Sequence, residues 1–333
     1  MSGENTAKVL LTDRAWPDDA VERAVLAAAG ITLVAGPADP APAPVIERLA
    51  AEHQPDAILT CWAPVSAAAI AAAPALRLVA RMGVGLDNID VAAATGRGVL
   101  VTNVPDYCVE EVSDHALALL LAWTRGVVAA DRQVRAGRWD PAAARLRRLS
   151  ALTCGVIGYG RTGRRTAGKL AALGARVLAH TPHPPPEEAG GVRFVALDEL
   201  LAGSDAVTVH APLTPATRHL IGARELSLMP RGSLLVNVSR GGLVDTAALA
   251  GALASGQLSG AGLDVLEGEP AVPQELLAHP GVVITPHIAF SSDASVHDLR
   301  RGAAEEVVRV LSGQPPRFPC NVPPPAAADG GRR

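Results

Sequence analysis

The chain has 333 residues, of which 49% are hydrophobic and 19% are charged, and its formal net charge is −3. This length accommodates two domains of ordinary size, and the composition is that of a globular protein. The small net charge gives no electrostatic reason to expect nucleic acid or an anionic membrane as a partner.

No apolar run in the sequence approaches the roughly 18 residues that a membrane-spanning helix needs, and the N-terminus lacks the basic-then-apolar order of a signal peptide. The four cysteines are too scattered to form a metal site, and they fit reduced thiols better than a disulfide framework. They are Cys61, Cys108, Cys154 and Cys320. We therefore expect a cytoplasmic protein without a bound metal.

The first hundred residues alternate short apolar runs with helical patterns. The expected strands are residues 8–12, 31–34, 56–60, 76–80 and 98–102, and the expected helices are residues 18–29, 43–51 and 66–73. Short buried strands separated by helices indicate a parallel sheet covered on both faces, which binds ligands at the carboxyl ends of its strands. The loop RMGVGLDN, residues 81–88, follows one such end. Its two glycines fit either an anion site or an ordinary turn.

A change of domain is expected near Pro105, after the fifth strand. A nearly continuous apolar helix is then predicted over residues 108–123. A helix that is apolar on most sides is buried in a core or against another subunit, and we favour contact with a second copy of the chain, as in a homodimer. The expected domains are residues 1–104 together with 291–333, and residues 105–290.

The stretch LTCGVIGYGRTG, Leu152 to Gly163, is expected to be a strand that turns sharply into a helix over residues 164–173. Gly158 allows the tight turn, Gly160 lets the backbone approach a pyrophosphate, and Gly163 lets the helix pack on the strand. The amides at the start of the helix favour a bound anion. Taken alone, the pattern fits either a dinucleotide site or a plain connection.

The strand that follows, residues 175–180, sets the choice between the two nicotinamide cofactors. An acidic residue is expected at its end, roughly 20 residues beyond the glycines, to bind the ribose 2′-hydroxyl of NAD. This chain has Thr181 there, followed by Pro182 and His183. A neutral hydroxyl does not repel the 2′-phosphate of NADP, yet no arginine follows to pair with it. Both NAD(H) and NADP(H) therefore remain candidates.

Polar residues follow each of the remaining expected strands, which are residues 206–210, 233–238, 262–265 and 282–285. Parallel strands place their carboxyl ends at one edge of the sheet, which is also the edge of the glycine turn. At this edge Arg240, Glu269 and His287 could meet at one nicotinamide. The fold class is therefore α/β, with two Rossmann-like or flavodoxin-like parallel-sheet domains and the active-site cleft between them.

Seven motifs carry a family resemblance. In chain order they are GVGLDNID, NVPDYCVEEVSDH, GVIGYGRTG, HAPLTPATRHLI, LLVNVSRGGLVD, GAGLDVLEGEP and ITPHIAF. On these motifs the chain resembles the D-isomer-specific 2-hydroxyacid dehydrogenases, which include phosphoglycerate dehydrogenase, glyoxylate reductase and C-terminal-binding protein. The resemblance extends from Lys8 to about Gly313.

The resemblance implies a catalytic trio, and each role is chemically reasonable. His287 would donate the proton to the carbonyl oxygen of a 2-keto acid, because imidazole titrates near neutrality. Glu269 would accept a hydrogen bond from the other ring nitrogen and favour the charged imidazolium. Arg240 would bind the substrate carboxylate or its carbonyl oxygen through its planar guanidinium. By contrast, His115 and His219, taken singly, are more simply interpreted as structural histidines.

The same resemblance assigns the remaining contacts to substrate and cofactor. The implied substrate residues are Arg81, Val84, Gly85 and Phe290, with Phe290 as a pocket wall. The implied cofactor residues are Gly158, Gly160, Arg161, Thr162, Gly163, Thr181, His210, Pro212, Thr217, Val238, Ser239 and Asp264, of which Asp264 would accept from the nicotinamide carboxamide.

The resemblance implies an NAD(P)-dependent D-2-hydroxyacid dehydrogenase that acts on a small 2-keto or 2-hydroxy acid. An unphosphorylated substrate is favoured, because Cys61 and Trp62 stand where phosphoglycerate dehydrogenases carry basic side chains. Formate is disfavoured as a substrate, because formate dehydrogenases pair their histidine with a glutamine where this chain has Glu269. Two alternatives remain: an NAD(H)-sensing dimeric scaffold of the corepressor type, and a phosphonate- or phosphite-oxidising relative. The tail, Pro315 to Arg333, is expected to be disordered over at least its last ten residues.

Overall fold

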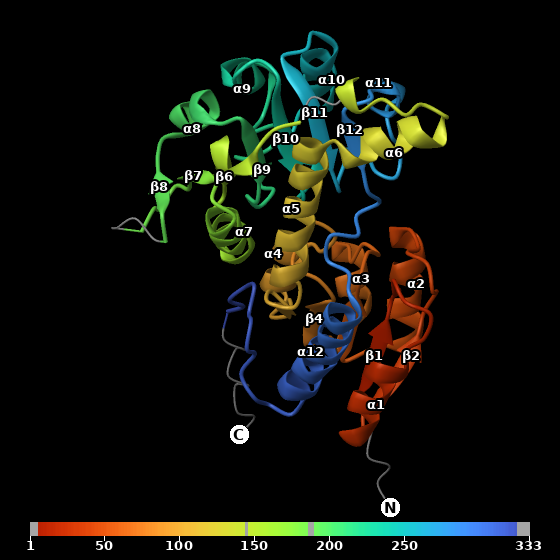
Figure 1. Cartoon of the computed structure of the whole chain (residues 1–333). Coiled ribbons are helices and arrows are strands. Elements are labelled where there is room, and N and C mark those ends of the chain that lie inside the picture. The colour runs from red at the N-terminus through yellow and green to blue at the C-terminus, as the bar shows by residue number, and fades with distance from the viewer. Residues whose placement is uncertain (1–5, 144–145, 186–189, 325–333) are drawn as a thin grey trace, which may run out of the picture. The chain divides into compact units, whose positions relative to one another are not determined.

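The computed structural model describes residues 6–143, 146–185 and 190–324, and it divides the chain into two compact units (Figure 1). Unit 1 comprises the chain up to Tyr107 and the chain from Ser292 onward, and unit 2 comprises Cys108–Ser291. Among the described residues, each unit contains one β-sheet in which every strand pairing is parallel. The predicted α/β class with two parallel sheets is confirmed.

Unit 1 contains a sheet with the strand order β2-β1-β3-β4-β5. Its strands are β1 (Lys8–Leu11), β2 (Thr32–Ala35), β3 (Ala57–Thr60), β4 (Leu78–Arg81) and β5 (Leu100–Thr102), and its helices are α1 (Ala20–Ala28), α2 (Ala43–His53), α3 (Ala67–Ala72), α4 (Val91–Gly96) and α12 (Asp293–Leu311). Successive residues of one strand enter different cores. Val9 and Leu11 pack in the core that includes α12, whereas Leu10 packs with α2 and α3. The sheet is therefore buried on both faces, as the continuous apolar strands predicted.

The chain after α12 runs along the edge strand β5. The backbone N–H of Cys320 donates to Val101 O at 2.7 Å, and the Asn321 side chain accepts from Val101 N and donates to Val99 O. An edge strand has unpaired backbone N–H and C=O groups, and this segment forms hydrogen bonds with those of β5. The part of the tail that was predicted to be disordered lies almost entirely outside the described residues, which end at Pro324.

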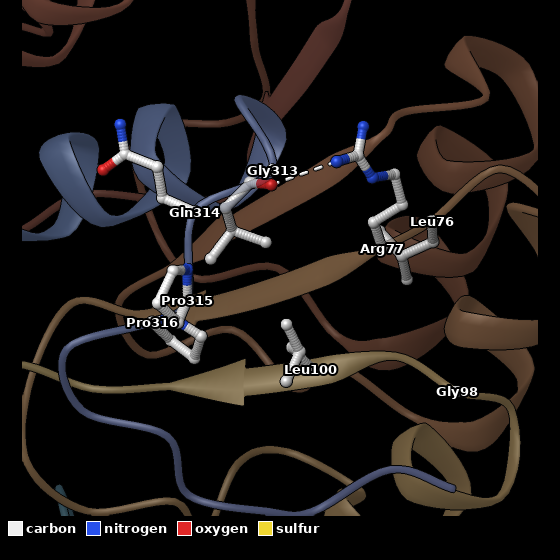
Figure 2. A pocket seen from close by; sticks show the side chains of 9 residues that line it. Leu76, Arg77, Gly98, Leu100, Gly313, Gln314, Pro315 and Pro316 are labelled. Atoms are coloured by element: carbon white, nitrogen blue, oxygen red, sulfur yellow. Dashed lines mark hydrogen bonds between the residues drawn. The ribbon is translucent and has the colours of Figure 1, made fainter. Parts of the chain in front are cut away.

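A surface pocket lies where this segment leaves α12 (Figure 2). The Arg77 side chain, at the start of β4, donates to the carbonyl oxygens of Val310 and Leu311 and so holds the end of α12 against the sheet. Leu100 and Pro315 line the same pocket. These contacts hold the start of the chain after α12 against unit 1, although its composition is that of a linker.

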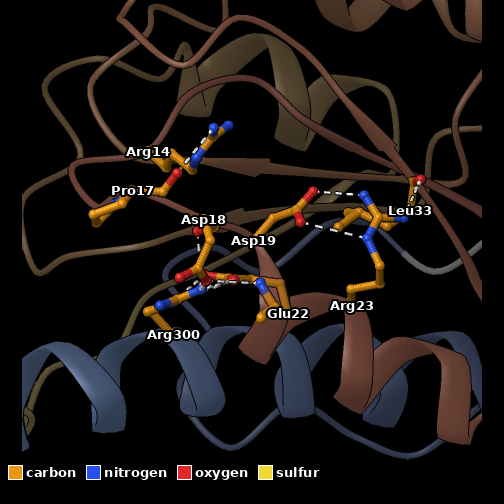
Figure 3. A network of polar contacts seen from close by, with 9 residues as sticks. Arg14, Pro17, Asp18, Asp19, Glu22, Arg23, Leu33 and Arg300 are labelled. Atoms are coloured by element: carbon orange, nitrogen blue, oxygen red, sulfur yellow. Dashed lines mark hydrogen bonds and ion pairs between the residues drawn. The ribbon is translucent and has the colours of Figure 1, made fainter.

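A buried ion pair joins α12 to α1 (Figure 3). Arg300 donates to both carboxylate oxygens of Glu22, which is fully buried, and also to the side chain and carbonyl of Asp18. Its guanidinium lies 5.3 Å from the ring centroid of Trp16. Because removing one partner would leave the other charge buried, this pair fixes the position of α12 on unit 1.

Unit 2 contains a sheet with the strand order β12-β11-β10-β9-β6-β7-β8. Its strands are β6 (Thr153–Ile157), β7 (Arg176–His180), β8 (Val192–Phe194), β9 (Ala206–Val209), β10 (Ser233–Asn237), β11 (Leu258–Leu263) and β12 (Val282–Ile284), and its α-helices are α5 (Val109–Arg125), α6 (Val127–Arg135), α7 (Arg161–Ala172), α8 (Leu197–Gly203), α9 (Ala223–Leu228), α10 (Thr246–Ala254) and α11 (Gln274–Ala278). The strand order reverses between β6 and β9. In such sheets the reversal point is where ligands bind.

Two predicted element boundaries in unit 2 are wrong. Helix α7 begins at Arg161 and not at Arg164, so Thr162 and Gly163 lie in its first turn. Strand β11 begins at Leu258, four residues before the prediction, because Gly260 and Gly262 weaken the strand signal in the sequence. Both errors arise at glycines whose conformation is set by packing.

The interpretation of the apolar helix α5 as an oligomer contact is wrong for its buried side chains. Ala116, Leu119 and Leu120 pack within unit 2, in a core that also includes residues of β6, β7 and β10. The helix lies against α7, β10 and β11 of its own unit. Its apolar character therefore needs no second subunit.

Among the described residues, none of the helices combines the length and the hydropathy that a membrane span requires.

Candidate active site

The predicted cofactor and catalytic residues of unit 2 follow the carboxyl ends of its parallel strands. Gly158 follows β6, Thr181 follows β7, and His210 follows β9. Arg240 follows β10, the loop that carries Glu269 follows β11, and His287 follows β12. Since β12, β11, β10, β9 and β6 are consecutive neighbours in the sheet, these loops lie along one edge.

Backbone geometry and packing require two of the three glycines in the turn between β6 and α7. Gly158 has a φ of +92°, and a Cβ there would lie 2.6 Å from the backbone N of Ala211. A Cβ on Gly163 would lie 1.9 Å from the carbonyl oxygen of Gly158. A Cβ on Gly160 would meet no atom within 4 Å, so the space at the start of α7 is open. This turn fits a phosphate group held by the first amides of α7.

Among the described residues 181–185, which follow β7, none carries a carboxylate. The backbone N–H of Gly158 donates to His180 O at 2.8 Å, which places Thr181 directly beside the glycine turn. Thr181 is half-buried, and Pro182 and His183 are exposed. The exposed side chains of Arg161 and Arg164 begin the helix on the other side of the turn.

Two aromatic side chains near the turn were not identified from the sequence. Tyr159 packs edge-to-face against Phe194 of β8, with ring centroids 4.8 Å apart, and the Arg164 guanidinium lies 5.5 Å from the Tyr159 ring. Tyr159 stands inside the glycine motif, so its position was visible in the sequence. Its partner on β8 was not, because no strand was predicted there.

His210 lies beneath the glycine turn as a neutral side chain. Its Cβ would be 3.3 Å from a Cβ on Gly163, and its Nε2 lies 3.0 Å from the Thr208 hydroxyl. Burial lowers the pKa of His210 to about 4, so the ring is uncharged at pH 7. His210 therefore shapes the floor of the turn and adds no positive charge to it.

Hydroxyl groups hold the loops that follow β9 and β10. The Ser239 hydroxyl donates to Ala211 O at 2.6 Å and so connects the two loops. The Thr217 hydroxyl donates to Pro212 O at 2.7 Å and accepts from Thr214 N at 2.8 Å. Val238, predicted near the nicotinamide, is buried at the end of β10. These residues of the predicted cofactor set are thus brought together on neighbouring loops.

The loop of Arg240 is fixed from within. The Asn237 side chain donates to Arg240 O at 2.9 Å and accepts from Ser239 N at 3.1 Å. The next residue, Gly241, lies so close to the loop after β11 that a Cβ there would be 1.9 Å from the carbonyl carbon of Leu266. This contact sets the position of Arg240 against the loop that carries Glu269.

Glu269 and His287 form a direct pair, with 2.8 Å between Glu269 Oε1 and His287 Nδ1. Partial burial alone would raise the pKa of Glu269. The hydrogen bond and charge of His287, the N–H of Leu266 and the charge of Arg240 outweigh burial and hold the Glu269 pKa below its ordinary value. Glu269 is therefore ionised at neutral pH. The three residues of the predicted trio act on one another electrostatically.

The backbone of His287 is in the left-handed region, with a φ of +55°. Its N–H donates to Asp264 O at 2.8 Å. The Asp264 side chain is almost fully buried: its Oδ1 accepts from Thr285 Oγ1 and from Ile288 N, and its Oδ2 accepts from Ala289 N. Asp264 was predicted to bind the nicotinamide, yet most of its hydrogen bonds hold the segment around His287. Phe290 follows this segment and is half-buried.

Unit 1 carries the other predicted substrate residues at the end of β4 and in the loop that follows it. Arg81 is buried, its guanidinium donates to the neighbouring Met82 O and lies 5.5 Å from the Trp62 ring, and it covers Gly83. The Asn103 side chain donates to Val84 O at 2.8 Å and fixes the loop, while the Val84 side chain remains exposed. Arg81, Val84 and Gly85 thus lie on one segment of unit 1, at the end of β4 and in the loop after it.

A second carboxylate hub, missed by the sequence analysis, lies beside the catalytic loop. Glu267 accepts from Arg218 and lies 3.0 Å from His219 Nε2. His219 also has a left-handed φ, of +53°. Its pairing with Glu267 could not be seen in the sequence, because it depends on how the two loops meet in the fold. This hub ties the loop after β9 to the loop of Glu269.

The described residues include no group of His, Cys, Asp and Glu side chains that could hold a metal ion.

The sequence and the fold were compared with those of known proteins. Residues 117–289 match the family profile described as "D-isomer specific 2-hydroxyacid dehydrogenase, NAD binding domain". The chain is 42% identical over 286 residues to D-3-phosphoglycerate dehydrogenase of Mycobacterium leprae, a match that covers 85% of this chain and 53% of that protein. The chain thus spans about half the length of such relatives.

Shorter relatives are matched over more of their length. The chain is 41% identical over 248 residues to glyoxylate reductase of Thermococcus litoralis, which covers 72% of this chain and 74% of that protein. Among solved structures, the NADPH-dependent glyoxylate/hydroxypyruvate reductase of Sinorhizobium meliloti, in complex with NADP and malonate, superposes with a TM-score of 0.83 at 32% identity, covering 94% of this chain and 96% of that one. The resemblance predicted from seven motifs is confirmed: the chain belongs to the D-isomer-specific 2-hydroxyacid dehydrogenase family.

Proposed function

We propose that the protein is an NAD(P)-dependent D-2-hydroxyacid dehydrogenase that reduces a 2-keto acid or oxidises the corresponding 2-hydroxy acid. The observation that carries this proposal is the Glu269–His287 pair, held under the charge of Arg240 at the same sheet edge as the glycine turn. An ionised carboxylate paired with Nδ1 favours the charged imidazolium, from which His287 can give a proton to the substrate.

The reduction requires a hydride at the carbonyl carbon and a proton at the carbonyl oxygen. A bound nicotinamide cofactor supplies the hydride, and Gly160 with the first turn of α7 would hold its pyrophosphate. His287 gives the proton from Nε2 while Nδ1 donates to Glu269, whose negative charge stabilises the imidazolium beforehand. Arg240 binds the carboxylate or polarises the carbonyl oxygen of the substrate. In the oxidation direction His287 takes the hydroxyl proton instead.

We infer that the substrate is an unphosphorylated 2-keto acid with a small or apolar side chain. The loop after β3 carries Cys61 and Trp62, and the buried Asp13 accepts from the backbone N–H groups of both at 3.0 and 2.6 Å. The Asp13 carboxylate behind this loop offsets the positive charge of Arg81 over Trp62, and so weakens the attraction for a second negative charge on a ligand. Phosphate binding would need basic side chains, which this loop lacks.

A substrate panel tests the proposal. We would follow NADH and NADPH absorbance with glyoxylate, pyruvate, hydroxypyruvate, phosphohydroxypyruvate and phosphite, the last with oxidised cofactor. Turnover of an unphosphorylated keto acid supports the proposal. Turnover of phosphite alone would assign a phosphite oxidase, and cofactor-dependent dimerisation without any turnover would assign a scaffold.

We propose that the enzyme accepts both NADH and NADPH. Thr181 stands at the end of β7, where an acid would repel a 2′-phosphate, and the side chains of Arg161, Arg164 and His183 are exposed. Values of kcat/KM for the two cofactors are expected to differ by less than about a hundredfold, because neither is bound by a dedicated charge. A thousandfold preference for NADH would contradict this.

Introducing the missing acid should create a preference. Thr181→Asp is expected to lower kcat/KM for NADPH by at least about tenfold, because the new carboxylate repels the 2′-phosphate, while NADH is used as well or better. Thr181→Val is the matched control, since it removes the hydroxyl without adding charge and should leave the NADPH rate nearly unchanged. Equal losses in both variants would show that only the side-chain volume matters.

We also propose that the protein is a homodimer that associates through helix α6 and the exposed apolar side chains of Trp139 and Leu146. Helix α6 has no buried residue, and the large apolar side chains of Val127, Val134 and Leu146 are exposed, as is 84% of Trp139. Such a concentration of exposed apolar side chains marks an interface.

Sedimentation velocity tests the dimer. Trp139→Glu is expected to convert the dimer to a monomer at micromolar concentration, because a charge cannot be buried without a partner. Leu173→Glu is the control, since Leu173 is also exposed but lies outside this proposed interface. A wild-type monomer, or a Trp139→Glu dimer, would contradict the proposal.

A further inference from the structure

Helix α5 and strand β11 lie side by side with matched spacing. Trp123 faces Gly260, where a Cβ would lie 3.0 Å from Trp123 Cδ1, and Leu119 faces Gly262, where a Cβ would lie 2.8 Å from Leu119 Cβ. Four residues of helix advance about 6 Å and two residues of strand about 6.6 Å, so the two series stay aligned. The next pair in both series is His115 and Asp264.

The pairing continues at that position through hydrogen bonds. His115 Nε2 lies 2.8 Å from Thr285 Oγ1, and the Thr285 hydroxyl donates to Asp264 Oδ1 at 2.6 Å. His115 Nε2 also lies 3.5 Å from the same carboxylate oxygen. A hydroxyl has one proton, and Thr285 gives it to Asp264, so Thr285 must accept from His115. His115 therefore carries its proton on Nε2.

Asp264 in turn holds the segment of His287 at three backbone positions. Its carboxylate accepts from Ile288 N and Ala289 N, each at 2.9 Å, and its carbonyl accepts from His287 N. The left-handed φ of His287 is strained for a residue with a side chain, and such conformations persist only where the surroundings enforce them. The hydrogen bonds of Asp264 provide that enforcement.

We propose that His115 is a positioning residue for His287, acting through Thr285 and Asp264. The close packing that Gly260 and Gly262 allow brings α5 near enough for His115 to fill the acceptor site of Thr285. With that site filled, the Thr285 hydroxyl points to Asp264, and the carboxylate stays oriented toward Ile288 and Ala289. His287 then keeps its ring aimed at Glu269. This inference rests on the proposed function only where His287 is taken as the proton donor.

The kinetic test compares three variants of α5. His115→Leu removes the donor and should lower kcat by about 10- to 100-fold, because His287 loses its alignment. His115→Gln places an amide N–H at the position of Nε2 and should restore kcat to within about threefold of the wild type. Ser113→Ala is the control, since it removes two hydrogen bonds on the same helix without touching Thr285. The Ser113 hydroxyl accepts from Lys169 Nζ and donates to Glu110 O.

A purely structural role would give a different pattern. It would lower the melting temperature in His115→Leu and Ser113→Ala alike and leave kcat unchanged in both. A kcat loss that His115→Gln does not rescue would also overturn the proposal. The double variant His115→Leu/Thr285→Val should be no slower than the slower single variant, and additive losses would show that the two residues act separately.

Nitrogen-detected NMR of the histidine rings makes the test independent of any substrate. His115 should appear as the Nε2–H tautomer, and the His287 ring cross-peak should move in His115→Leu but not in His115→Gln or Ser113→Ala. An Nδ1–H tautomer at His115, or a His287 cross-peak that stays in place in His115→Leu, would refute the inference. If the substrate panel finds no turnover, these spectra still decide it.

Discussion

Replacing His287 by alanine is expected to slow the reduction of a 2-keto acid by about two to four decades. The variant removes the group that gives its proton to the carbonyl oxygen and leaves the glycine turn and Arg240 in place. The KM for the cofactor should therefore change little while kcat falls. Stopped-flow measurement of NAD(P)H oxidation in a single turnover would separate the chemical step from product release.

His219 provides a matched control for this substitution. It also has a left-handed φ, of +53° against +55° for His287, and it also pairs with a carboxylate, that of Glu267 at 3.0 Å. His219→Ala therefore removes a similar side chain, ion pair and backbone strain from a neighbouring loop. We expect it to slow the reaction by less than about tenfold. If both variants lose activity equally, His287 is no more than a structural histidine, and the mechanism above is wrong.

The position of the candidate site could be predicted from the sequence because parallel strands carry their loops to a common edge. The polar motifs after β9, β10, β11 and β12 needed only the strand assignments to be placed together, and the strands were identified from short apolar runs. The pairing of Glu269 with His287 then followed from the family resemblance. The structure adds the 2.8 Å contact and the electrostatic cause of the lowered Glu269 pKa.

The support around the site could not be predicted in the same way. His115 lies 170 positions from Thr285 in the sequence, and their contact depends on how closely α5 approaches β11. That approach is set by Gly262 against Leu119, a tertiary contact that has no signature in local propensity. The same glycines led to the wrong start of β11. Residues that weaken a strand in sequence-based prediction thus prove to be those that bring the helix close enough for His115 to act.

Gly241→Ala is expected to destabilise the protein by about 3 kcal/mol or more and to lower kcat at least about a hundredfold. A Cβ at this position would lie 1.9 Å from Leu266 C, 2.1 Å from Leu266 O and 2.2 Å from Glu267 N. All three atoms belong to the backbone, so no rotamer change can relieve the overlap, and the loop after β10 must move away from the loop after β11. Chemical denaturation and steady-state kinetics would measure the two losses.

Gly251→Ala is the control that separates this steric effect from the general cost of losing a glycine. Gly251 lies on α10, is exposed, and a Cβ there would meet no atom within 4 Å. Alanine is the better helix former, so this variant should gain about 0.5–1 kcal/mol of stability and keep full activity. Near-normal kcat in Gly241→Ala would show that Arg240 and Glu269 do not depend on the contact between their loops. A large loss of kcat in a variant that remains folded would show that the spacing of these two charges, and not their presence alone, makes the site competent.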